Sequence, residues 1–256
     1  MQVASEALVH DLRQQLAGRS ALDVLTEIAA QFAGKAIFST SFGLEDQIIT
    51  HLIFEHELPI KVFTLDTARN FQETYSTWNK TLYRYGKAIE PYFPRQSSVE
   101  QLLLSKGPNS FYDSVENRKE CCGIRKVEPL NRALAGQQAW FTGIRAEQSA
   151  NRHDMHAVEW DGPHQLLKFH PLFDWTFEQC WDFVHAHSIP FNPLHQQGFV
   201  SIGCAPCTRA IQPGEDFRAG RWWWEDQSAK ECGLHSTAAH NGPDPVVEPV
   251  NASTLP

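Results

Sequence analysis

Two hydrophobic periodicities alternate along the first part of the chain. Residues 5–33 have the apolar spacing of amphipathic helices, with a break at 18–20 and a stop at Gly34. Short apolar runs rich in β-formers then alternate with helical spacing: strands are expected at 35–42, 60–66 and 88–94, and helices at 43–58 and 70–86. Strand followed by helix, repeated, predicts right-handed crossovers and a mainly parallel α/β sheet flanked by helices.

The same pattern continues to about residue 190 and is then lost. A helix is expected at 127–136, a strand at 138–145, and a helix at 174–189 opened by Asp174 or Thr176 as N-cap. The Pro-rich stretch 241–256 predicts disorder. With no repeat and no clear linker, one domain is expected over residues 1–240. Its parts are N-terminal helices (1–34), an α/β core (35–200) and a functional C-terminal segment (201–240).

Composition narrows the class of protein. The 256 residues are 42% hydrophobic and 20% charged, as in ordinary globular proteins, and no run approaches the roughly 20 apolar residues of a membrane span. The N-terminus lacks the basic start and apolar run of a signal peptide, so a cytoplasmic protein is expected. The net charge of −8 argues against a nucleic-acid binder. Basic residues clustered near the cysteines favour a small anionic ligand instead.

Two loops that connect a strand to the following helix have the polar composition of a nucleotide site. The first, "STSFGLED", offers the hydroxyls of Ser39, Thr40 and Ser41, and Gly43 permits close backbone approach. A Ser/Thr-rich helix cap without a ligand explains this loop equally well. The second, "LDTARNFQETY", carries Asp66, Thr67 and Arg69. The Walker pattern is absent, which disfavours a P-loop ATPase.

Four of the six cysteines form two close pairs, Cys121–Cys122 and Cys204–Cys207. Adjacent cysteines are poor disulfide partners, whereas four thiolates suit zinc or an iron–sulfur cluster. A redox dithiol at Cys204 and Cys207 is the rival interpretation. Cys180 falls on an apolar helix face and is expected to be buried.

Cys232, in "KECGLH", stands alone near the C-terminus. Lys230 and His235 would favour its thiolate and Glu231 would oppose it, so a nucleophile and an incidental surface thiol are both consistent with these residues.

Seven segments in this order resemble one family: "STSFGLED", "LDTARNFQETY", "ECCGIRK", "TGIRAEQSANR", "GCAPCTRAI", "RAGRWWWED" and "KECGLH". Together they resemble the assimilatory sulfonucleotide reductases, in particular the bacterial thioredoxin-dependent adenylylsulfate reductases, over most of residues 35–240. The two cysteine pairs with the terminal Glu-Cys-Gly-Leu-His make the match specific. The resemblance implies an adenine nucleotide α-hydrolase-like (Rossmann-like) fold with a mobile C-terminal segment that carries the nucleophile.

The resemblance also implies chemistry. Cys121, Cys122, Cys204 and Cys207 would bind a [4Fe–4S] cluster. Cys232 would attack the sulfur of adenosine 5′-phosphosulfate, expelling AMP and leaving an S-sulfonate, from which thioredoxin (or glutaredoxin) would release sulfite. The cluster cysteines favour this substrate over 3′-phosphoadenylylsulfate, and an enzyme that prefers the latter or accepts both is the main alternative.

Further residues are assigned to substrate binding by the same resemblance: Ser39, Thr40, Ser41, Gly43, Leu65, Lys126, Gly143, Arg145, Arg152, Arg218, Arg221 and His235. Two other rivals are a pyrophosphatase of the same fold that modifies tRNA, and a structural zinc protein. The loop "STSFG" departs from the Ser-Gly-Gly form of the ATP-cleaving branch, which weighs against the first. The sequence leaves the choice between a monomer and a homo-oligomer open.

Overall fold

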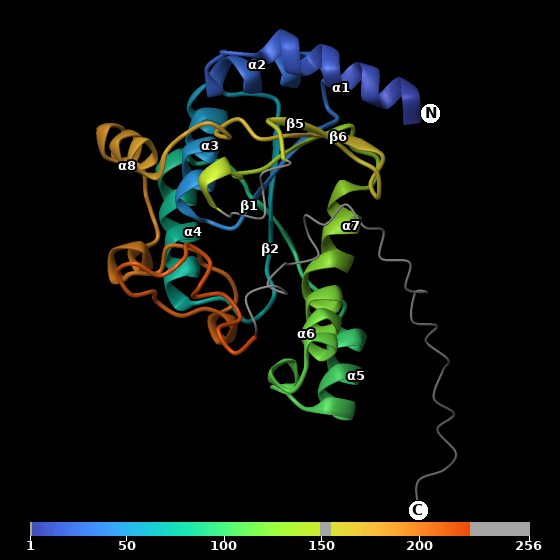
Figure 1. Cartoon of the computed structure of the whole chain (residues 1–256), viewed down its shortest axis with the longest axis vertical. Coiled ribbons are helices and arrows are strands. Elements are labelled where there is room, and N and C mark those ends of the chain that lie inside the picture. The colour runs from blue at the N-terminus through green and yellow to red at the C-terminus, as the bar shows by residue number, and fades with distance from the viewer. Residues whose placement is uncertain (1, 149–154, 226–256) are drawn as a thin grey trace, which may run out of the picture.

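The computed structural model describes residues 2–148 and 155–225 (Figure 1). Its helices and strands follow in the order α1 (Gln2–Leu16), α2 (Ala21–Gln31), β1 (Ala36–Thr40), α3 (Leu44–Glu55), β2 (Lys61–Leu65), α4 (Gln72–Tyr85), β3 (Glu90–Tyr92), α5 (Gln96–Lys106), α6 (Val115–Cys122), α7 (Glu128–Leu134), β4 (Ala139–Phe141), β5 (Val158–Asp161), β6 (Leu166–Phe169) and α8 (Phe177–Ala186). A π-helical turn (Gly123–Val127) joins α6 to α7.

The strands form one sheet in the order β3-β2-β1-β4-β6-β5. All neighbouring pairs are parallel except β5 and β6, which are antiparallel at one edge. The chain adds strands outward from β1 to β3 and then returns to place β4 on the other side of β1. This reversal is the topological switch point, where open α/β sheets bind ligands at the carboxyl ends of their strands. The predicted α/β fold is confirmed, and the β5–β6 pair is an addition that the sequence patterns did not reveal.

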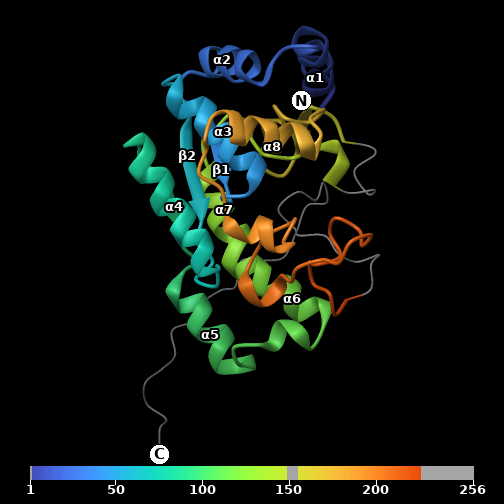
Figure 2. The same ribbon diagram turned by 90° about the vertical axis from the view of Figure 1, so that its left-hand side faces the viewer.

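Both faces of the sheet are covered, as an all-parallel centre requires. In β1, Ala36 and Phe38 belong to the larger core, which includes residues of α1, α2, α3 and α8. The residue between them, Ile37, points to the other face and packs with Leu130 and Leu134 of α7. Figure 2 shows α3 and α8 together on one side of the strands. The loops that connect β1 and β2 to their following helices are therefore fixed between two packed layers.

Local sequence explains where several helices begin and end. Thr176 caps α8, and its side chain and that of Gln179 form a reciprocal capping box, so the second of the two predicted caps is the one used. Ser20 caps α2 in a similar way, by accepting from the backbone N–H of Asp23. Gly86 ends α4 in the left-handed conformation. No helix among the described residues is long and apolar enough to cross a bilayer.

The sequence patterns missed α5 and α6. Each buries little apolar surface: Leu102 is the buried residue of α5, and the buried residue of α6 is the cation Arg118. Neither helix therefore shows the apolar stripe that periodicity detects. Figure 1 shows α6 continuing into α7 through the π-helical turn, so the cysteine pair ends one helix directly before the next. Such π turns in helices often mark functional sites.

Candidate active site

A pocket of about 230 Å³ opens at the switch point. Its walls come from the segments that follow β1, β2 and β4, and from residues 200–204 and 217–221. Of the residues predicted to bind substrate, the pocket wall includes Ser39, Thr40, Ser41, Gly43, Leu65, Lys126, Gly143, Arg218 and Arg221. Arg152, Cys232 and His235 lie outside the described residues.

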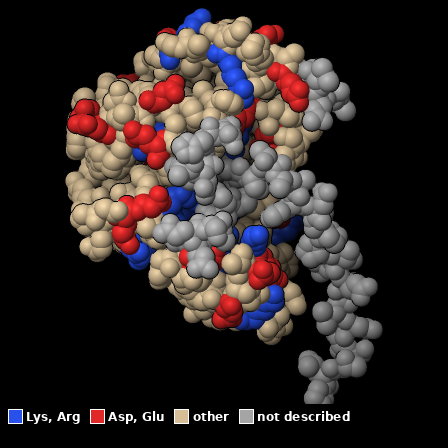
Figure 3. Space-filling view, viewed as in Figure 1, with Lys and Arg blue, Asp and Glu red and all other residues tan. Residues whose placement is uncertain are grey.

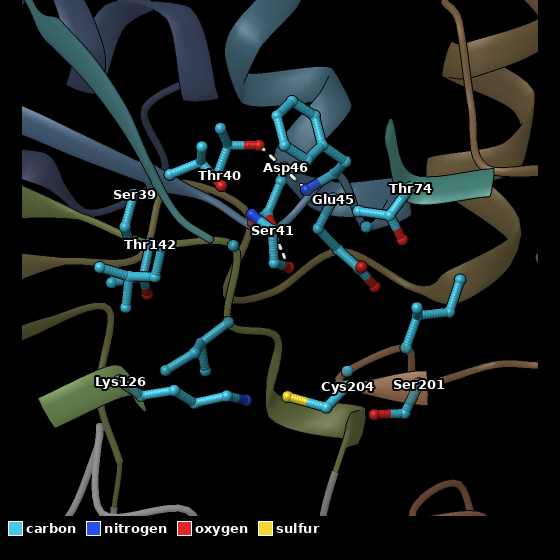
Figure 4. Close-up of a pocket in the computed structure, with 18 of the residues that line it drawn as sticks. Ser39, Thr40, Ser41, Glu45, Asp46, Thr74, Lys126, Thr142, Ser201 and Cys204 are labelled. Carbon is cyan, nitrogen blue, oxygen red and sulfur yellow. Dashed lines mark hydrogen bonds between the residues drawn. The ribbon is translucent and has the colours of Figure 1, made fainter. Parts of the chain in front are cut away.

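Asp46 organises the loop after β1. Its Oδ2 accepts hydrogen bonds from the backbone N–H of Ser41 (2.7 Å) and from the Ser41 hydroxyl (2.6 Å), as Figure 4 shows. Burial raises the pKa of Asp46 to about 6, although the bonds from Ser41 lower it. A Cβ atom at Gly143 would lie 2.3 Å from Asp46 Oδ1, so the loop after β4 closes directly on this carboxyl group. Because Asp46 occupies these loop donors, the anionic part of a ligand is expected elsewhere in the pocket.

Three cationic side chains of the pocket wall could bind the anionic part of a ligand. Lys126, Arg218 and Arg221 all line the pocket. Arg221 is 7% exposed, and its guanidinium lies over the ring of Trp222 at 4.9 Å. In Figure 4 the Lys126 ammonium and the Cys204 thiol point toward one another across the pocket. Figure 3 shows Lys and Arg atoms near the centre of the face seen in Figure 1. The cationic side of the pocket is thus the side next to the cysteines.

Arg145 takes a different place from the predicted one. It is fully buried and outside the pocket wall, where it ion-pairs with Glu45 (2.7 Å) and Glu147 (2.9 Å). Glu45 does line the pocket. Arg145 therefore neutralises a carboxylate at the edge of the pocket, and the structure gives it no direct access to a ligand there.

Sequence reasoning missed several pocket residues: Glu45, Asp46, Asn70, Thr74, Thr142, His195, Ser201 and Gly203. His195 has a defined state, because burial lowers its pKa and its Nδ1 lies 2.8 Å from the carbonyl oxygen of Phe199. A neutral ring that donates from Nδ1 fits this contact. The signal that could have found Ser201 and Gly203 is their place just before Cys204, in a segment without periodicity.

The four paired cysteines surround one small cavity. Cys121 and Cys122 reach it from the end of α6, and Cys204 and Cys207 reach it from a 3₁₀ turn, Ala205–Cys207. All four are free thiols. The same cavity is lined by cations: Arg69, Arg118, Arg125 and Lys126. Lys126 and Cys204 belong to both cavities, so the two sites share a wall.

Four thiols around one cavity are a donor set that would suit zinc or an iron–sulfur cluster. Burial raises the pKa of the Cys207 thiol to about 12, with a further rise from Cys204, while Lys126 and Arg221 oppose it. The Cys207 thiol therefore keeps its proton in the protein alone, and a metal group that replaced this proton would find cations ready to offset the thiolate charge. Phe111 and Trp222 add an apolar shell. Within residues 2–148 and 155–225, no three His, Cys, Asp or Glu side chains gather closely enough for a metal ion.

Solved structures place this architecture in a known class. The FMN adenylyltransferase of Candida glabrata, in complex with FAD and pyrophosphate, aligns over 89% of this chain and 86% of its own at a TM-score of 0.51 and 16% identity, which shows a shared fold. The phosphoadenylyl-sulfate reductase of Candida auris, a phosphate complex, aligns over 79% of this chain and 96% of its own at a TM-score of 0.68 and 26% identity. The fold is thus of the adenine nucleotide α-hydrolase type.

The sequence identifies the family. Residues 35–210 match the phosphoadenosine phosphosulfate reductase domain, and the chain belongs to that family of reductases. The adenosine 5′-phosphosulfate reductase of Allochromatium vinosum is 49% identical over 84% of each chain. That of Burkholderia cepacia is 47% identical over 91% of this chain and 94% of its own. The family resemblance read from the motifs is confirmed.

Proposed function

We propose that the chain reduces adenosine 5′-phosphosulfate to sulfite and AMP in assimilatory sulfate reduction. The observation that carries the proposal is the shared wall, in which Lys126 and Cys204 line both the nucleotide pocket and the cysteine cavity. The names of relatives at 47–49% identity support the same substrate.

We expect the neutral adenosine and the anionic phosphosulfate of the substrate to bind at different ends of the pocket. The loop after β1 and the backbone at Leu65 would hold the adenosine, because Asp46 makes this end unsuited to a phosphate. Lys126, Arg218 and Arg221 would hold the phosphosulfate. In the transition state, negative charge grows on the oxygen that bridges sulfur and phosphorus, and preorganised cations stabilise it more than they stabilise the ground state.

The transfer needs a thiolate, which we assign to Cys232. This thiolate attacks the substrate sulfur, the bond from sulfur to the bridging oxygen breaks, and AMP leaves with the electron pair. The enzyme is left with an S-sulfonate. A thiolate of a dithiol protein, thioredoxin or glutaredoxin, then attacks Cys232 Sγ and releases sulfite with its electron pair. The second thiol of the donor restores Cys232, so the donor disulfide accounts for the two electrons.

The cofactor is part of the proposal. Cys121, Cys122, Cys204 and Cys207 would hold a [4Fe–4S] cluster, which when bound supplies a polarisable group beside Lys126. The proposed transfer at Cys232 passes no electron through it. Iron and sulfide on analysis, rather than zinc, would support this assignment, and zinc at one equivalent with no iron would replace it by a structural zinc site.

One experiment tests the reaction directly. The protein is incubated with adenosine 5′-phosphosulfate without any thioredoxin, and its peptides are examined by mass spectrometry. We expect a sulfonate adduct on Cys232 and stoichiometric AMP, with neither in Cys232→Ser. An adduct on another cysteine, or AMP release without an adduct, contradicts the mechanism.

A second substrate is the alternative to test. The similar structure from Candida auris is a phosphoadenylyl-sulfate reductase, and its substrate differs by a 3′-phosphate. We expect kcat/KM to be larger for adenosine 5′-phosphosulfate. Equal values for the two nucleotides would make the chain a dual-specificity reductase.

Four features of the protein stay predictions: its cytoplasmic location, the identity of its reductant, its oligomeric state and its single-domain boundaries.

A further inference from the structure

Gly203 lies against the end of a substrate-site arginine. A Cβ atom at this position would lie 2.3 Å from Nη2, 2.6 Å from Cζ and 3.1 Å from Nη1 of Arg221. Contacts under 3.0 Å are essentially never made by real Cβ atoms, so any side chain here must displace the guanidinium. The planar end of Arg221 therefore rests directly on the backbone of Gly203.

Arg221 has little room to move elsewhere. Its guanidinium lies 4.9 Å from the ring centre of Trp222, and its Nη1 lies 3.4 Å from the Ser201 hydroxyl. Its main chain is fixed by a β-bridge to Thr208. With only 7% of the residue exposed, a guanidinium displaced from Gly203 must change its position in the pocket wall.

The backbone of Gly203 is itself held in place. Its N–H donates to the Thr208 hydroxyl (3.1 Å), which in turn donates to the Cys204 carbonyl oxygen (2.9 Å). In Figure 4 Ser201 and Cys204, on either side of this glycine in sequence, lie together at the pocket wall. Hydrogen bonds thus hold the backbone of this loop in place where Arg221 packs against it.

We propose that Gly203 is a positioning residue that sets where Arg221 presents its charge to the anionic part of the substrate. It acts through Arg221 and needs no contact with substrate. This inference rests on the proposed function and adds to it a determinant of anion affinity. Gly220, which precedes Arg221 in the sequence, shows the contrast. A Cβ at Gly220 would lie 2.3 Å from the backbone carbonyl oxygen of Arg209, so substitution there strains the main chain instead.

The test is a double-mutant cycle of Gly203→Ala and Arg221→Ala, with AMP and adenosine binding measured by calorimetry on the cofactor-loaded protein. Gly203→Ala should weaken AMP binding about tenfold, as expected for a weakened charge-assisted hydrogen bond, and change adenosine binding less than about twofold. In the Arg221→Ala background it should have no further effect on AMP. KM for the phosphosulfate should rise more than kcat falls.

Controls separate positioning from damage to the fold. Gly162→Ala, where a Cβ would meet nothing within 4 Å, should leave AMP affinity unchanged. Iron content and thermal midpoint of Gly203→Ala should match the wild type to within about 2 °C, because the clash is with the end of a side chain. Equal loss of AMP affinity with and without Arg221, or loss of iron, would overturn the inference. Wild-type protein that binds neither AMP nor adenosine would overturn the proposed function, and the inference with it.

Discussion

The two neighbouring cavities are built in different ways. The nucleotide pocket takes its hydroxyls and backbone groups from loops at the carboxyl ends of β1, β2 and β4, so the parallel sheet itself places them. The cysteine cavity is formed mainly by the end of α6, the π-helical turn and the 3₁₀ turn Ala205–Cys207, which belong to no sheet, with Arg69 added from the loop after β2. The pocket is thus a consequence of topology, whereas the cysteine cavity depends on long-range contacts between irregular segments.

Burial also has different consequences in the two cavities. In the pocket, the pKa of Asp46 is raised to about 6 by burial, and no cation is among the main causes of this shift. In the cysteine cavity, Arg125 and Lys126 oppose the effect of burial on the pKa values of Cys121 and Cys207. Negative charge is therefore disfavoured at the end of the pocket beside α3 and compensated on the cysteine side. Substitutions in the two cavities should separate these properties.

The largest expected effect comes from removing a cysteine of the second cavity. Cys207→Ser should abolish iron binding and lower kcat by about 10³-fold or more, equivalent to about 4 kcal/mol. AMP affinity should change less than about threefold, because the sheet builds the nucleotide pocket. Iron analysis, steady-state assays and calorimetry check the three expectations.

The matched control for Cys207→Ser is Cys180→Ser. Cys180 is fully buried in the larger core, outside the cysteine cavity. This variant should keep its iron and its activity. Full iron content in Cys207→Ser, or a loss of AMP affinity as large as the loss of activity, would contradict the separation of the two cavities.

The next effect concerns what holds the cysteine cavity together. Arg118 of α6 and Glu225 form an ion pair at 2.8 Å with side chains 1% and 4% exposed, and the guanidinium lies over Trp222 at 4.6 Å. Arg118→Ala leaves the carboxylate buried without this partner, which should lower the free energy of unfolding by about 3–5 kcal/mol.

Urea unfolding of both proteins with cofactor bound measures the loss. Arg95→Ala provides the control, since its pair with Glu128 is 65% and 32% exposed and should contribute less than about 1 kcal/mol. Similar losses in the two variants would show that burial does not distinguish the pairs.

The sequence predicted the first cavity better than the second, for a physical reason. Strands and the loops that connect them to the next helix follow from local periodicity, so Ser39 to Gly43 could be placed at the pocket from the sequence. The cysteine residues could be assigned to one site only through their spacing and the family resemblance. The helix that carries Cys121 and Cys122, α6, has no apolar stripe, and its ion pair joins Arg118 to a residue 107 positions away.

Arg145 shows the other limit of sequence reasoning. Its motif marked it as a cation near the substrate, but its charge is used by Glu45, 100 positions earlier in the chain. Gly203 could not be singled out from its letter either, because its importance lies in the space that Arg221 fills. Which buried charge pairs with which, and which glycine needs to be a glycine, depends on the packed structure.

Asp46 gives a pH-dependent test of the first cavity. Its pKa in the folded protein, about 6, lies above the ordinary value of 3.8, so the folded protein holds the proton more tightly than the unfolded chain. Relative to Asp46→Asn, the wild type should therefore lose stability as pH rises from about 4 to about 6, by up to about 3 kcal/mol.

The measurement is urea unfolding of the two proteins at several pH values. Any pH-independent cost of the substitution cancels, because the expectation concerns only the slope of the difference. Parallel curves for the two proteins would mean that Asp46 is ionised normally in the folded state.

The smallest expected effect is also the sharpest for the comparison, because Lys126 lines both cavities. Lys126→Gln removes the charge and should weaken AMP binding about 10- to 100-fold, whereas Lys126→Arg should recover part of it. Iron content should stay unchanged, since the ammonium is no ligand.

If Lys126 couples the sites, adding AMP should perturb the visible spectrum of the iron-loaded wild type. This perturbation should disappear in Lys126→Gln at saturating AMP. A perturbation that survives the substitution would show that the shared wall, through Cys204, couples the cavities without this charge.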